Sequence, residues 1–461
     1  MRPPFPFPPA ALRLLACGAL SWAVAAGELP PGGEQAAILA RIKAPDFAGR
    51  DFVISNYGGT PDGDCTGAIA QAIVACHEAG GGRVVVPAGV WLSGAVHLRS
   101  NVNLHLAEGA TLRFYPEPAR YLPVVLTRFE GIECMNFSPL IYAFEQENVA
   151  VTGQGTLDGS ANAGTWWAWN NKATSNPTRQ SADRQRLDQQ GNDGTPVAER
   201  VYGEGHFLRP NFIQPYRCRN VLIEGVTIIN SPMWEIHPVL CTNVTVRGVH
   251  VHSLGTNNDG CDPESCRDVL IEDCVFETGD DCIALKSGRN NDGRRVGVAA
   301  ENTVIRRCLM KDGHGGVTMG SEVSGDVRNV FVEDCQMDSP HLDRAIRFKS
   351  NAMRGGVIEN IFVHHVEIGR VARAVLSVEF DYEEGAHGPH KPVLRNVLIE
   401  GVTTKSAGCV AVMTAFPGAT IDAVRLKDCI FRGVEGADVL KDAGTLTLQN
   451  VAIEPAKAGK K

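Results

Sequence analysis

Three aspartates stand where a repeating chain could bring them together. Asp259 lies in the sequence NNDG, and Asp280 and Asp281 lie in TGDDC, so that Asp259 and Asp281 are 22 residues apart. Carboxyl groups held side by side cannot all ionise freely, because each negative charge raises the pKa of its neighbours. Such a cluster offers an acid and a base together, which is what hydrolysis of a glycosidic bond requires. Taken singly, the same Asn/Asp/Gly runs would be typical of turns.

Cationic and aromatic residues follow at similar intervals. His314, in GHGG, comes 33 residues after Asp281, and Arg347 and Lys349 come 33 and 35 residues after His314. Tyr382 comes 35 residues after Arg347. Arg347 and Lys349 are two apart on an expected strand and so share a face. Beside three acids, they favour a site for a sugar that carries a carboxylate. Without the acids, surface ion pairs and a turn histidine would be the better interpretation.

An internal repeat predicts the elements that position these side chains. The unit Asn-Val-x-Ile/Val-x-x-Val/Cys-x-Ile/Phe recurs at spacings of 23 to 36 residues. Its alternating apolar residues predict short strands joined by a turn. A unit this short cannot bury its own apolar face, so the copies must stack strand to strand. The sequence therefore predicts an all-β protein that forms a single right-handed parallel β-helix. The copies begin at Asn220, Asn243, Asp268, Asn302, Asn329, Asn360 and Asn396.

Two rows of side chains should run along this stack. The residues that open the copies should stack at one turn, because Asn tolerates left-handed backbone and bonds its own main chain. The residues six positions later should form an interior row: Val226, Val249, Cys274, Cys308, Cys335, Val366 and Val402. A helix over residues 66–79 is expected to cap the open N-terminal end. Its apolar face would hold Ile69, Ala72, Ile73 and Cys76.

Composition narrows the class of protein. The 461 residues carry a formal net charge of -8, and 44% of them are hydrophobic and 21% charged, which is typical of a folded globular chain. The negative charge argues against nucleic acid or an anionic membrane as a partner. The 14 cysteines include no CxxC pair, so they are expected to be buried thiols. No metal or cofactor is predicted.

The N-terminal residues resemble a secretory signal. An apolar run extends from Leu14 to Ala26, and Ala23-Val24-Ala25 fits a cleavage site. A secreted or periplasmic protein is expected, and a lipoprotein signal ending at Cys17 is the less favoured alternative. No later segment reaches the roughly 18 apolar residues of a membrane span. The expected organisation is a signal peptide at 1–26, a linker at 27–45, a β-helix catalytic domain at 46–455 with a long loop insertion at 160–212, and a tail at 456–461.

The insertion and Trp234 each allow two interpretations, and a basic run follows the acids. The insertion at 160–212 contains three tryptophans within residues 166–169; loops this long are usually functional, but tryptophans could equally anchor it to the barrel. Trp234 precedes Asp259 by 25 residues and is expected to stack on a sugar or to pack against the insertion. A basic run is expected to be a solvated face. It comprises Lys286, Arg289, Arg294 and Arg295.

Five motifs, taken in order, resemble the signature of glycoside hydrolase family 28, the polygalacturonases and their relatives. They are NNDG (257–260), TGDDC (278–282), GHGG (313–316), RFK (347–349) and DYEEG (381–385). The resemblance implies a right-handed parallel β-helix and metal-free hydrolysis with inversion at the anomeric carbon. Asn258 and Phe348 depart from the common pattern, where Thr and Ile are usual. The insertion resembles that of the longer bacterial exo-acting members, in which it would close one end of the groove.

The resemblance also implies a role for each site residue. Asp280 would be the general acid, Asp259 and Asp281 would activate the water, and His314 would support the acid. Arg347 and Lys349 would hold the carboxylate of the galacturonate just beyond the scissile bond, and Tyr382 would contact the same sugar. The expected substrate-binding set is Asn257, Arg347, Lys349, Tyr382 and Trp234.

The expected function is that of an exported, exo-acting polygalacturonase that cleaves α-1,4-galacturonosyl linkages. Its partner would be a pectic polysaccharide or an oligogalacturonide. A rhamnogalacturonan or xylogalacturonan hydrolase of the same family is the first alternative. A β-helix pectate lyase, which would need calcium, and a carbohydrate-binding β-helix without activity are the others.

Overall fold

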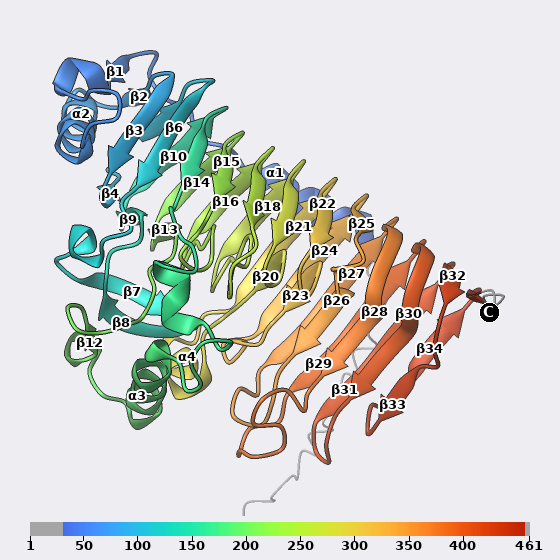
Figure 1. Cartoon of the computed structure of the whole chain (residues 1–461). Helices are drawn as coiled ribbons and strands as arrows, with labels where there is room; N and C mark the ends of the chain where they lie inside the picture. The colour runs from blue at the N-terminus through green and yellow to red at the C-terminus, as the bar shows by residue number, and fades with distance from the viewer. Residues whose placement is uncertain (1–30, 457–461) are drawn as a thin grey trace, which may run out of the picture.

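The computed structural model describes residues 31–456. These residues form a right-handed parallel β-helix, which confirms the predicted fold class, and Figure 1 shows its coils stacked from the blue N-terminal end to the red C-terminal end. The predicted signal peptide, the alternative at Cys17 and all but one residue of the predicted tail lie outside the described residues. None of the helices within residues 31–456 combines the length and the apolarity that crossing a bilayer requires.

Two large sheets make up the stack. The 13-stranded sheet runs in the order β1 (Asp51–Val53), β2 (Gly82–Val86), β5 (Val102–Leu106), β10 (Glu147–Gly153), β14 (Arg219–Glu224), β16 (Thr242–Arg247), β18 (Arg267–Glu272), β21 (Ala300–Arg306), β24 (Val327–Glu333), β27 (Val357–His364), β29 (Val393–Glu400), β31 (Thr420–Lys427) and β34 (Leu446–Gln449). Neighbouring strands pair in parallel, so each coil repeats the register of the coil before it.

The 16-stranded sheet covers two further faces, which merge in the long strand β28. One face holds β3 (Gly89–Ser93), β6 (Ala110–Phe114), β11 (Thr156–Asp158), β15 (Thr227–Ile229), β17 (His250–Ser253), β19 (Val275–Thr278), β22 (Leu309–Asp312), β25 (Gln336–Asp338) and β28 (Glu367–Glu379). The other holds β20 (Ile283–Leu285), β23 (Val317–Met319) and β26 (Arg344–Lys349), which also pairs with β28. Beyond β28 follow β30 (Thr403–Thr414), β32 (Ile430–Val434), β33 (Val439–Lys441) and β35 (Ala452–Pro455).

Both predicted rows of side chains are present. Each asparagine in the turn row has a positive φ, between 54° and 64°. Their amides hydrogen-bond from coil to coil, as in Asn220 to Asn148 (2.8 Å), Asn243 to Asn220 (2.7 Å) and Asn396 to Asn360 (2.7 Å). The interior row is at most 2% exposed at every one of its seven positions. The 13 cysteines of the described chain are free and buried, as predicted.

Two helices pack on the stack, the capping helix at its N-terminal end and the other on its middle coils (Figure 1). The predicted capping helix is α2 (Thr66–Glu78), and its four predicted apolar residues are buried in the core that it shares with the first strands. Helix α1 (Pro31–Arg41) lies inside the expected linker. Ile38 and Ile42 pack on outward-facing residues of the 13-stranded sheet, among them Val304 and Phe331. This part of the linker is therefore folded.

The segment expected as a long loop is largely ordered. It contains η3 (Trp166–Asn170), α3 (Arg179–Asp193), η4 (Val197–Glu199) and β12 (Val201–Tyr202). Helix α3 begins with a capping box between Thr178 and Ser181 and ends at Gly194, whose φ is 73°. The buried rings of Trp166 and Trp169 pack on one another. Both rings belong to the main core of the coils, and Trp166 packs edge-on against Tyr121, so these tryptophans anchor the insertion.

A second excursion from the coils was not expected from the sequence. After η2 (Pro118–Tyr121), strands β7 (Val125–Phe129) and β8 (Ile132–Asn136) form an antiparallel hairpin that β12 extends. Strands β4 (Val96–His97), β9 (Ile141–Phe144) and β13 (Ile213–Tyr216) pair alongside. The remaining helices are η1 (Ile54–Tyr57) and α4 (Asn290–Val296). Helices α3 and α4 and this hairpin stand on one side of the coils (Figure 1).

Candidate active site

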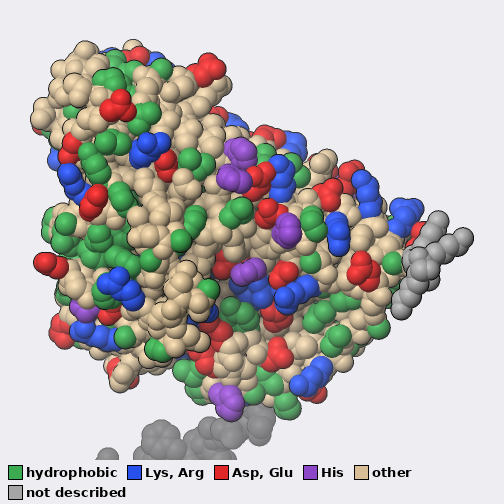
Figure 2. Space-filling view, in the orientation of Figure 1, with side chains coloured by type: hydrophobic (Ala, Val, Ile, Leu, Met, Phe, Trp, Pro, Cys, Tyr) green, Lys and Arg blue, Asp and Glu red, His purple; other side chains and the backbone are tan. Residues whose placement is uncertain are grey.

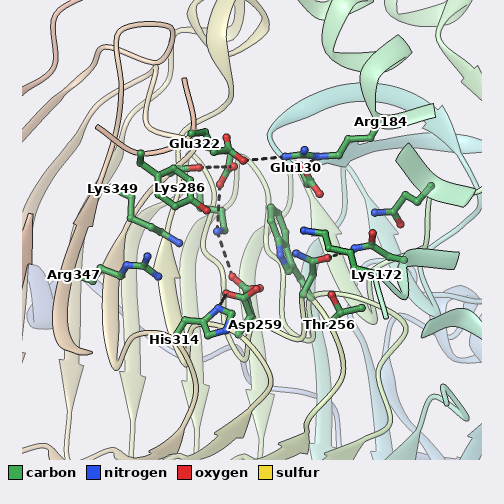
Figure 3. Close-up of a pocket in the computed structure, with 18 of the residues that line it drawn as sticks. Glu130, Lys172, Arg184, Thr256, Asp259, Lys286, His314, Glu322, Arg347 and Lys349 are labelled. Carbon is green, nitrogen blue, oxygen red and sulfur yellow. Dashed lines mark hydrogen bonds and ion pairs between the residues drawn. The ribbon is translucent and has the colours of Figure 1, made fainter. Parts of the chain in front are cut away.

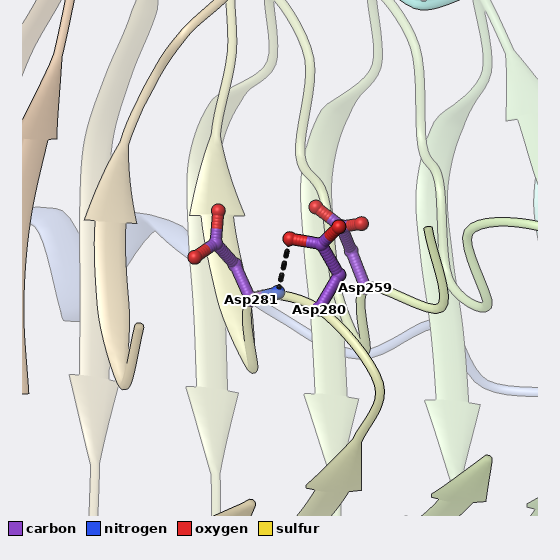
Figure 4. Close-up of side chains that lie close together, drawn as sticks. All are labelled: Asp259, Asp280 and Asp281. Atoms are coloured by element: carbon purple, nitrogen blue, oxygen red, sulfur yellow. Dashed lines mark hydrogen bonds between the residues drawn. The ribbon is translucent and has the colours of Figure 1, made fainter. Parts of the chain in front are cut away.

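The three aspartates converge, as their spacing predicts. Asp259 follows β17, and Asp280 and Asp281 lie between β19 and β20, one coil later. The amide of Gly260 donates to the carbonyl of Asp281 at 3.0 Å, which fixes the two turns against each other. One carboxylate oxygen from each aspartate lies within 4.8 Å of the others (Figure 4).

Local residues explain why these turns form. The Asn258 side chain is fully buried. Its oxygen accepts from the Ser253 hydroxyl and the Gly255 amide, both at 2.8 Å, and its nitrogen donates to the carbonyls of Ser231 and Met233. Asn258 therefore shapes the turn beneath Asp259 without entering the cavity.

Asp281 is a buried, charged carboxylate. Lys349 Nζ lies 2.6 Å from its Oδ2, and Arg347 Nη1 lies 3.5 Å from its Oδ1. Burial alone would raise the pKa of Asp281, but Lys349 and Arg347 hold it below its usual range. A Cβ at Gly315 would come 2.8 Å from Asp281 Oδ1, so the GHGG glycine makes room for this carboxylate.

Asp281 stays a predicted activator of the water. Its side chain is 0% exposed, and Lys349 and Arg347 both contact its carboxylate. One of its oxygens lies within 4.8 Å of the nearest oxygens of Asp259 and Asp280. Asp281 therefore also holds these two cations beside the acid cluster.

Asp259 and Asp280 face the cavity and differ in their surroundings. Burial, followed by the charge of Asp280, raises the pKa of Asp259 well above its usual range, and Lys286 opposes that rise. Asp280 is more open, with 18% of its side chain exposed, and its Oδ1 lies 3.0 Å from His314 Nδ1. This hydrogen bond raises the pKa of His314. Each carboxyl thus has its own basic neighbour.

The other predicted residues surround the acids. The ring centre of Tyr382 lies 5.4 Å from Lys349 Nζ and 5.8 Å from the Arg347 guanidinium carbon. Asn257 Oδ1 accepts from Arg209 Nη2 at 2.7 Å and from Asn170 Nδ2 at 2.9 Å. Asn257 therefore joins the coils to the insertion.

Trp234 packs against the insertion, and its stacking on a sugar stays a prediction. It lines the cavity, with Lys286 Nζ 4.4 Å from its ring centre. It also packs in a buried cluster with Leu187 and Tyr202 of the insertion.

A cavity of about 530 Å³ contains this site. Apart from Asp281, every predicted site residue lines it. In Figure 3, Arg347 and Lys349 lie on one side of Asp259 and His314, and Lys172 of the insertion lies on the other. Figure 2 shows charged side chains gathered on this face between the insertion and the coils. The cavity has room for a small number of sugar units.

Two residues of the basic run that was expected to be a solvated face, Lys286 and Arg289, are buried. Lys286 and Arg289 are 2% and 4% exposed. Arg289 pairs with Asp188 of α3 at 2.9 Å and with Glu130 of the hairpin at 3.4 Å. These carboxylates compensate the buried charge, which would otherwise be costly.

The closeness of the three aspartates would also suit an ion with oxygen ligands. However, Lys349 and Arg347 already supply positive charge to Asp281, and Lys286 supplies it to Asp259 at 3.5 Å. This charge balance favours acid–base chemistry at the cluster.

Comparison with known proteins agrees with the site. The family model for glycosyl hydrolases family 28 matches residues 187–435, which include the three aspartates and the cations around them. The chain belongs to glycosyl hydrolase family 28. The resemblance seen in the five motifs is thereby confirmed.

Family 28 relatives match this chain over most of its length. A probable polygalacturonase of Vitis vinifera is 30% identical over 323 residues, which cover 67% of this chain and 58% of the relative. An exo-poly-alpha-D-galacturonosidase of Dickeya chrysanthemi is 25% identical and covers 72% of this chain and 57% of the relative. The chain thus spans less than two thirds of either curated relative.

A solved structure is more similar. An exopolygalacturonase from Thermotoga maritima superposes with a TM-score of 0.87 at 42% identity, covering 91% of this chain and 95% of that one. A Yersinia enterocolitica family 28 exopolygalacturonase, at 20% identity and a TM-score of 0.65, shares the fold.

The sequence analysis missed several residues that line the family 28 site. Lys172 and Arg184 come from the insertion, Glu130 from the hairpin and Glu322 from the turn after β23. Among the ion pairs of residues 31–456, Arg184 pairs with Glu130, whereas Lys172 has no carboxylate partner. The basic character of the insertion was a signal in the sequence, but its partner residues are too distant to have been inferred.

Proposed function

We propose that this protein is an exo-acting polygalacturonase that hydrolyses α-1,4-galacturonosyl linkages at the end of a pectic chain. The observation that carries the proposal is a pair of cavity-facing carboxyls, Asp259 and Asp280, beside cations on both sides. A polygalacturonate chain has a carboxylate on every sugar, so such a site matches its charge. The names of the relatives support the same substrate.

In this proposal Asp280 protonates the leaving oxygen. It is the most exposed of the three carboxyls, and His314 positions it through the 3.0 Å contact. Asp259 and Asp281 activate the attacking water, with Asp259 accepting its proton, and Asp281 also keeps Lys349 and Arg347 in place. General acid–base catalysis of this kind contributes about 10²–10⁴-fold to a rate.

The two sugars joined by the scissile bond lie on opposite sides of the acids. Arg347, Lys349 and Tyr382 hold the carboxylate of the sugar on the leaving-group side. Lys172, exposed and without a carboxylate partner in the described chain, binds the carboxylate of the terminal sugar on the other side. Because Lys172 belongs to the insertion, the segment that limits the cavity also recognises the chain end.

The insertion supports cleavage from the chain end. Residues of η3 and α3 form the cavity wall on the Lys172 side, together with Glu130 of the hairpin. Trp166, Trp169 and the pairs of Arg289 hold this wall against the coils. A wall fixed in this way leaves room for a chain terminus but not for a continuing polymer.

Inversion at the anomeric carbon is proposed from the family resemblance. The nearest carboxyl oxygens lie within 4.8 Å, whereas most inverting glycosidases separate their carboxyl groups by about 6.5–9.5 Å and retaining ones by about 5–5.5 Å. Distance and family thus point in opposite directions. Proton NMR of the first-formed anomer decides the matter: a β product from the α linkage supports inversion, and an α product refutes it.

Export is proposed from residues 1–26, since a pectic polymer is too large to enter a cell intact. Cleavage of the chain after residue 26 on secretion is the expected observation.

The test of the proposed function uses defined oligogalacturonides. The wild-type protein should release reducing sugar without forming an ultraviolet-absorbing unsaturated product, and D280N should bind the oligomer without cleaving it. Formation of an unsaturated product would instead identify a lyase. Unchanged sugar release by D280N would reject the assignment of Asp280.

A further inference from the structure

A buried lysine stands beneath the acids, outside the five motifs. Lys286 is 2% exposed and follows strand β20. Its Nζ lies 3.4 Å from Glu322 Oε2, 3.5 Å from Asp259 Oδ2 and 3.8 Å from Asp262 Oδ2. It also donates to the carbonyl of Gly320 at 3.3 Å. A lysine is almost never buried so completely without partners, and this one has three.

Lys286 distinguishes between the two cavity-facing carboxyls. It is the cation that pairs with Asp259 within residues 31–456, and its ion pairs do not include Asp280. Asp280 has His314 as its own partner instead. Two carboxyls this close compete for a single proton. Lys286 keeps its charge next to Asp259, whereas His314 next to Asp280 loses its charge as the pH rises, so these two neighbours together direct the shared proton to Asp280.

The proton must lie on Asp280 for the proposed reaction. A proton on Asp259 would block the carboxylate that accepts a proton from water in the proposed reaction, and would leave Asp280 without the proton that it donates. Burial favours this unproductive arrangement, because Asp259 is the more deeply buried carboxyl. Something must oppose it, and Lys286 is in contact with Asp259.

We propose that Lys286 is a positioning residue for hydrolysis: it keeps Asp259 ionised, and thereby places the shared proton on Asp280. This inference rests on the proposed function for its kinetic consequences, but the charge of Asp259 can be measured without any substrate. Lys286 also packs on the face of Trp234, so it supports the floor of the cavity.

Other charged groups set the background for this effect. Those that face Lys286 are Asp259, Asp262, Asp281, Glu322, Lys349 and His237. Those that face Asp259 are Asp262, Asp280, Asp281, Lys286, Lys349, Glu235 and Arg209. Burial raises the pKa of Asp262 and of Glu235 well above the usual range. The carboxyls in contact with Lys286 are those of Asp259, Asp262 and Glu322.

The experiment compares K286M with K286R in the full chain. The rate of oligogalacturonide hydrolysis, as kcat and kcat/KM, is measured across pH. Removing the cation should move the acidic limb of the profile upward by about one pH unit or more, with kcat falling about tenfold for each unit at pH values below the limb. K286R keeps the charge and should restore most of the shift.

Asp262 offers a matched control. D262N changes another carboxyl that faces Lys286, is fully buried and does not line the cavity. Because D262N leaves Lys286 in contact with Asp259, this variant should leave the acidic limb in place. A role in packing alone would lower kcat equally at all pH values in K286M, with no shift of the limb, and would overturn the proposal.

A second variant covers the case in which K286M does not fold. K286M/E322Q removes opposite charges together and should show the same shift of the acidic limb.

Carboxyl ¹³C NMR of aspartate-labelled protein, assigned with D259N, follows the titration of Asp259 directly. If the wild-type protein hydrolyses no oligogalacturonide, the proposed function fails, and this titration still decides the role of Lys286. An Asp259 that titrates identically in wild type and K286M refutes it.

Discussion

The ion pair between Lys349 and Asp281 allows a quantitative test of the site's construction. Its atoms lie 2.6 Å apart, and the two side chains are 7% and 0% exposed. Removing one partner of such a pair costs about 3–5 kcal/mol, because the other charge remains buried. K349M retains Arg347, which lies 3.5 Å from Asp281 in the wild-type protein. We therefore expect the lower end of that range, about 3 kcal/mol.

The assay is urea unfolding at pH 7, followed by far-UV circular dichroism. The variant K349M/D281N removes both charges and should recover at least about 1 kcal/mol of the loss. The matched control is the surface pair of Arg83 and Asp51, at 2.8 Å with both side chains 43% exposed. R83M should cost less than about 1 kcal/mol.

The pH dependence gives an independent check of the same pair. The pKa of Asp281 is lowered in the folded state. Its contribution to stability is therefore present above the unfolded value of about 3.9 and is lost as the pH falls through the folded pKa. The difference in stability between wild type and D281N should shrink as the pH falls below 4. An effect of K349M below about 0.5 kcal/mol at pH 7, similar to that of R83M, would refute the reasoning.

Three further predictions concern other parts of the molecule. K172A should raise KM for oligogalacturonides more than tenfold with a smaller change in kcat, whereas K43A, an exposed lysine outside the cavity, should change neither; equal kinetics in both variants would contradict the role of Lys172. N329A should lower the free energy of unfolding by about 1 kcal/mol, because Asn329 forms hydrogen bonds with Asn302 at 3.0 Å and with Asn360 at 2.9 Å. An unchanged urea midpoint would show that the asparagine row does not stabilise the coils. H314Q should lower the free energy of unfolding by less than about 1 kcal/mol, and chiefly below pH 6.5. Asp280 raises the pKa of His314, so the histidine loses its contribution to stability as the pH rises through that pKa. A loss of stability that grows above pH 8 would contradict the pairing.

The repeat carried most of the fold. Asn220, Asn243 and their equivalents recur because every coil needs left-handed backbone at the same corner, so they mark the coils in the sequence. The convergence of Asp259 with Asp281 follows from the same period. Properties that repeat once per coil can therefore be predicted.

The structure of the segments that leave the coils could not be predicted from the repeat. The residues of β7 and β8 alternate like those of a coil, and nothing local shows that they pair antiparallel. Helix α3 buries Gln180 and Asp183 as well as Leu187, so it lacks a clear apolar period. Its polar residues are satisfied by distant partners, as Asp183 is by His206.

The burial of charged residues could not be predicted from the sequence either. Arg289 looks like a surface residue until Glu130 and Asp188, each more than 100 residues away, are placed against it. The direct ion pairs of Asp281 with Lys349 and Arg347 are likewise visible only in the structure. Charge balance depends on tertiary contacts, which a single sequence does not show.

The sizes of the products formed over time test the closed, two-carboxyl site most directly. A galacturonate hexamer labelled at its reducing end should lose one sugar at a time, so that labelled pentamer, tetramer and trimer appear in that order while free galacturonate accumulates from the start. D280N should give none of these products. Labelled fragments of several sizes appearing together at the first time point would show an open groove and would contradict the account.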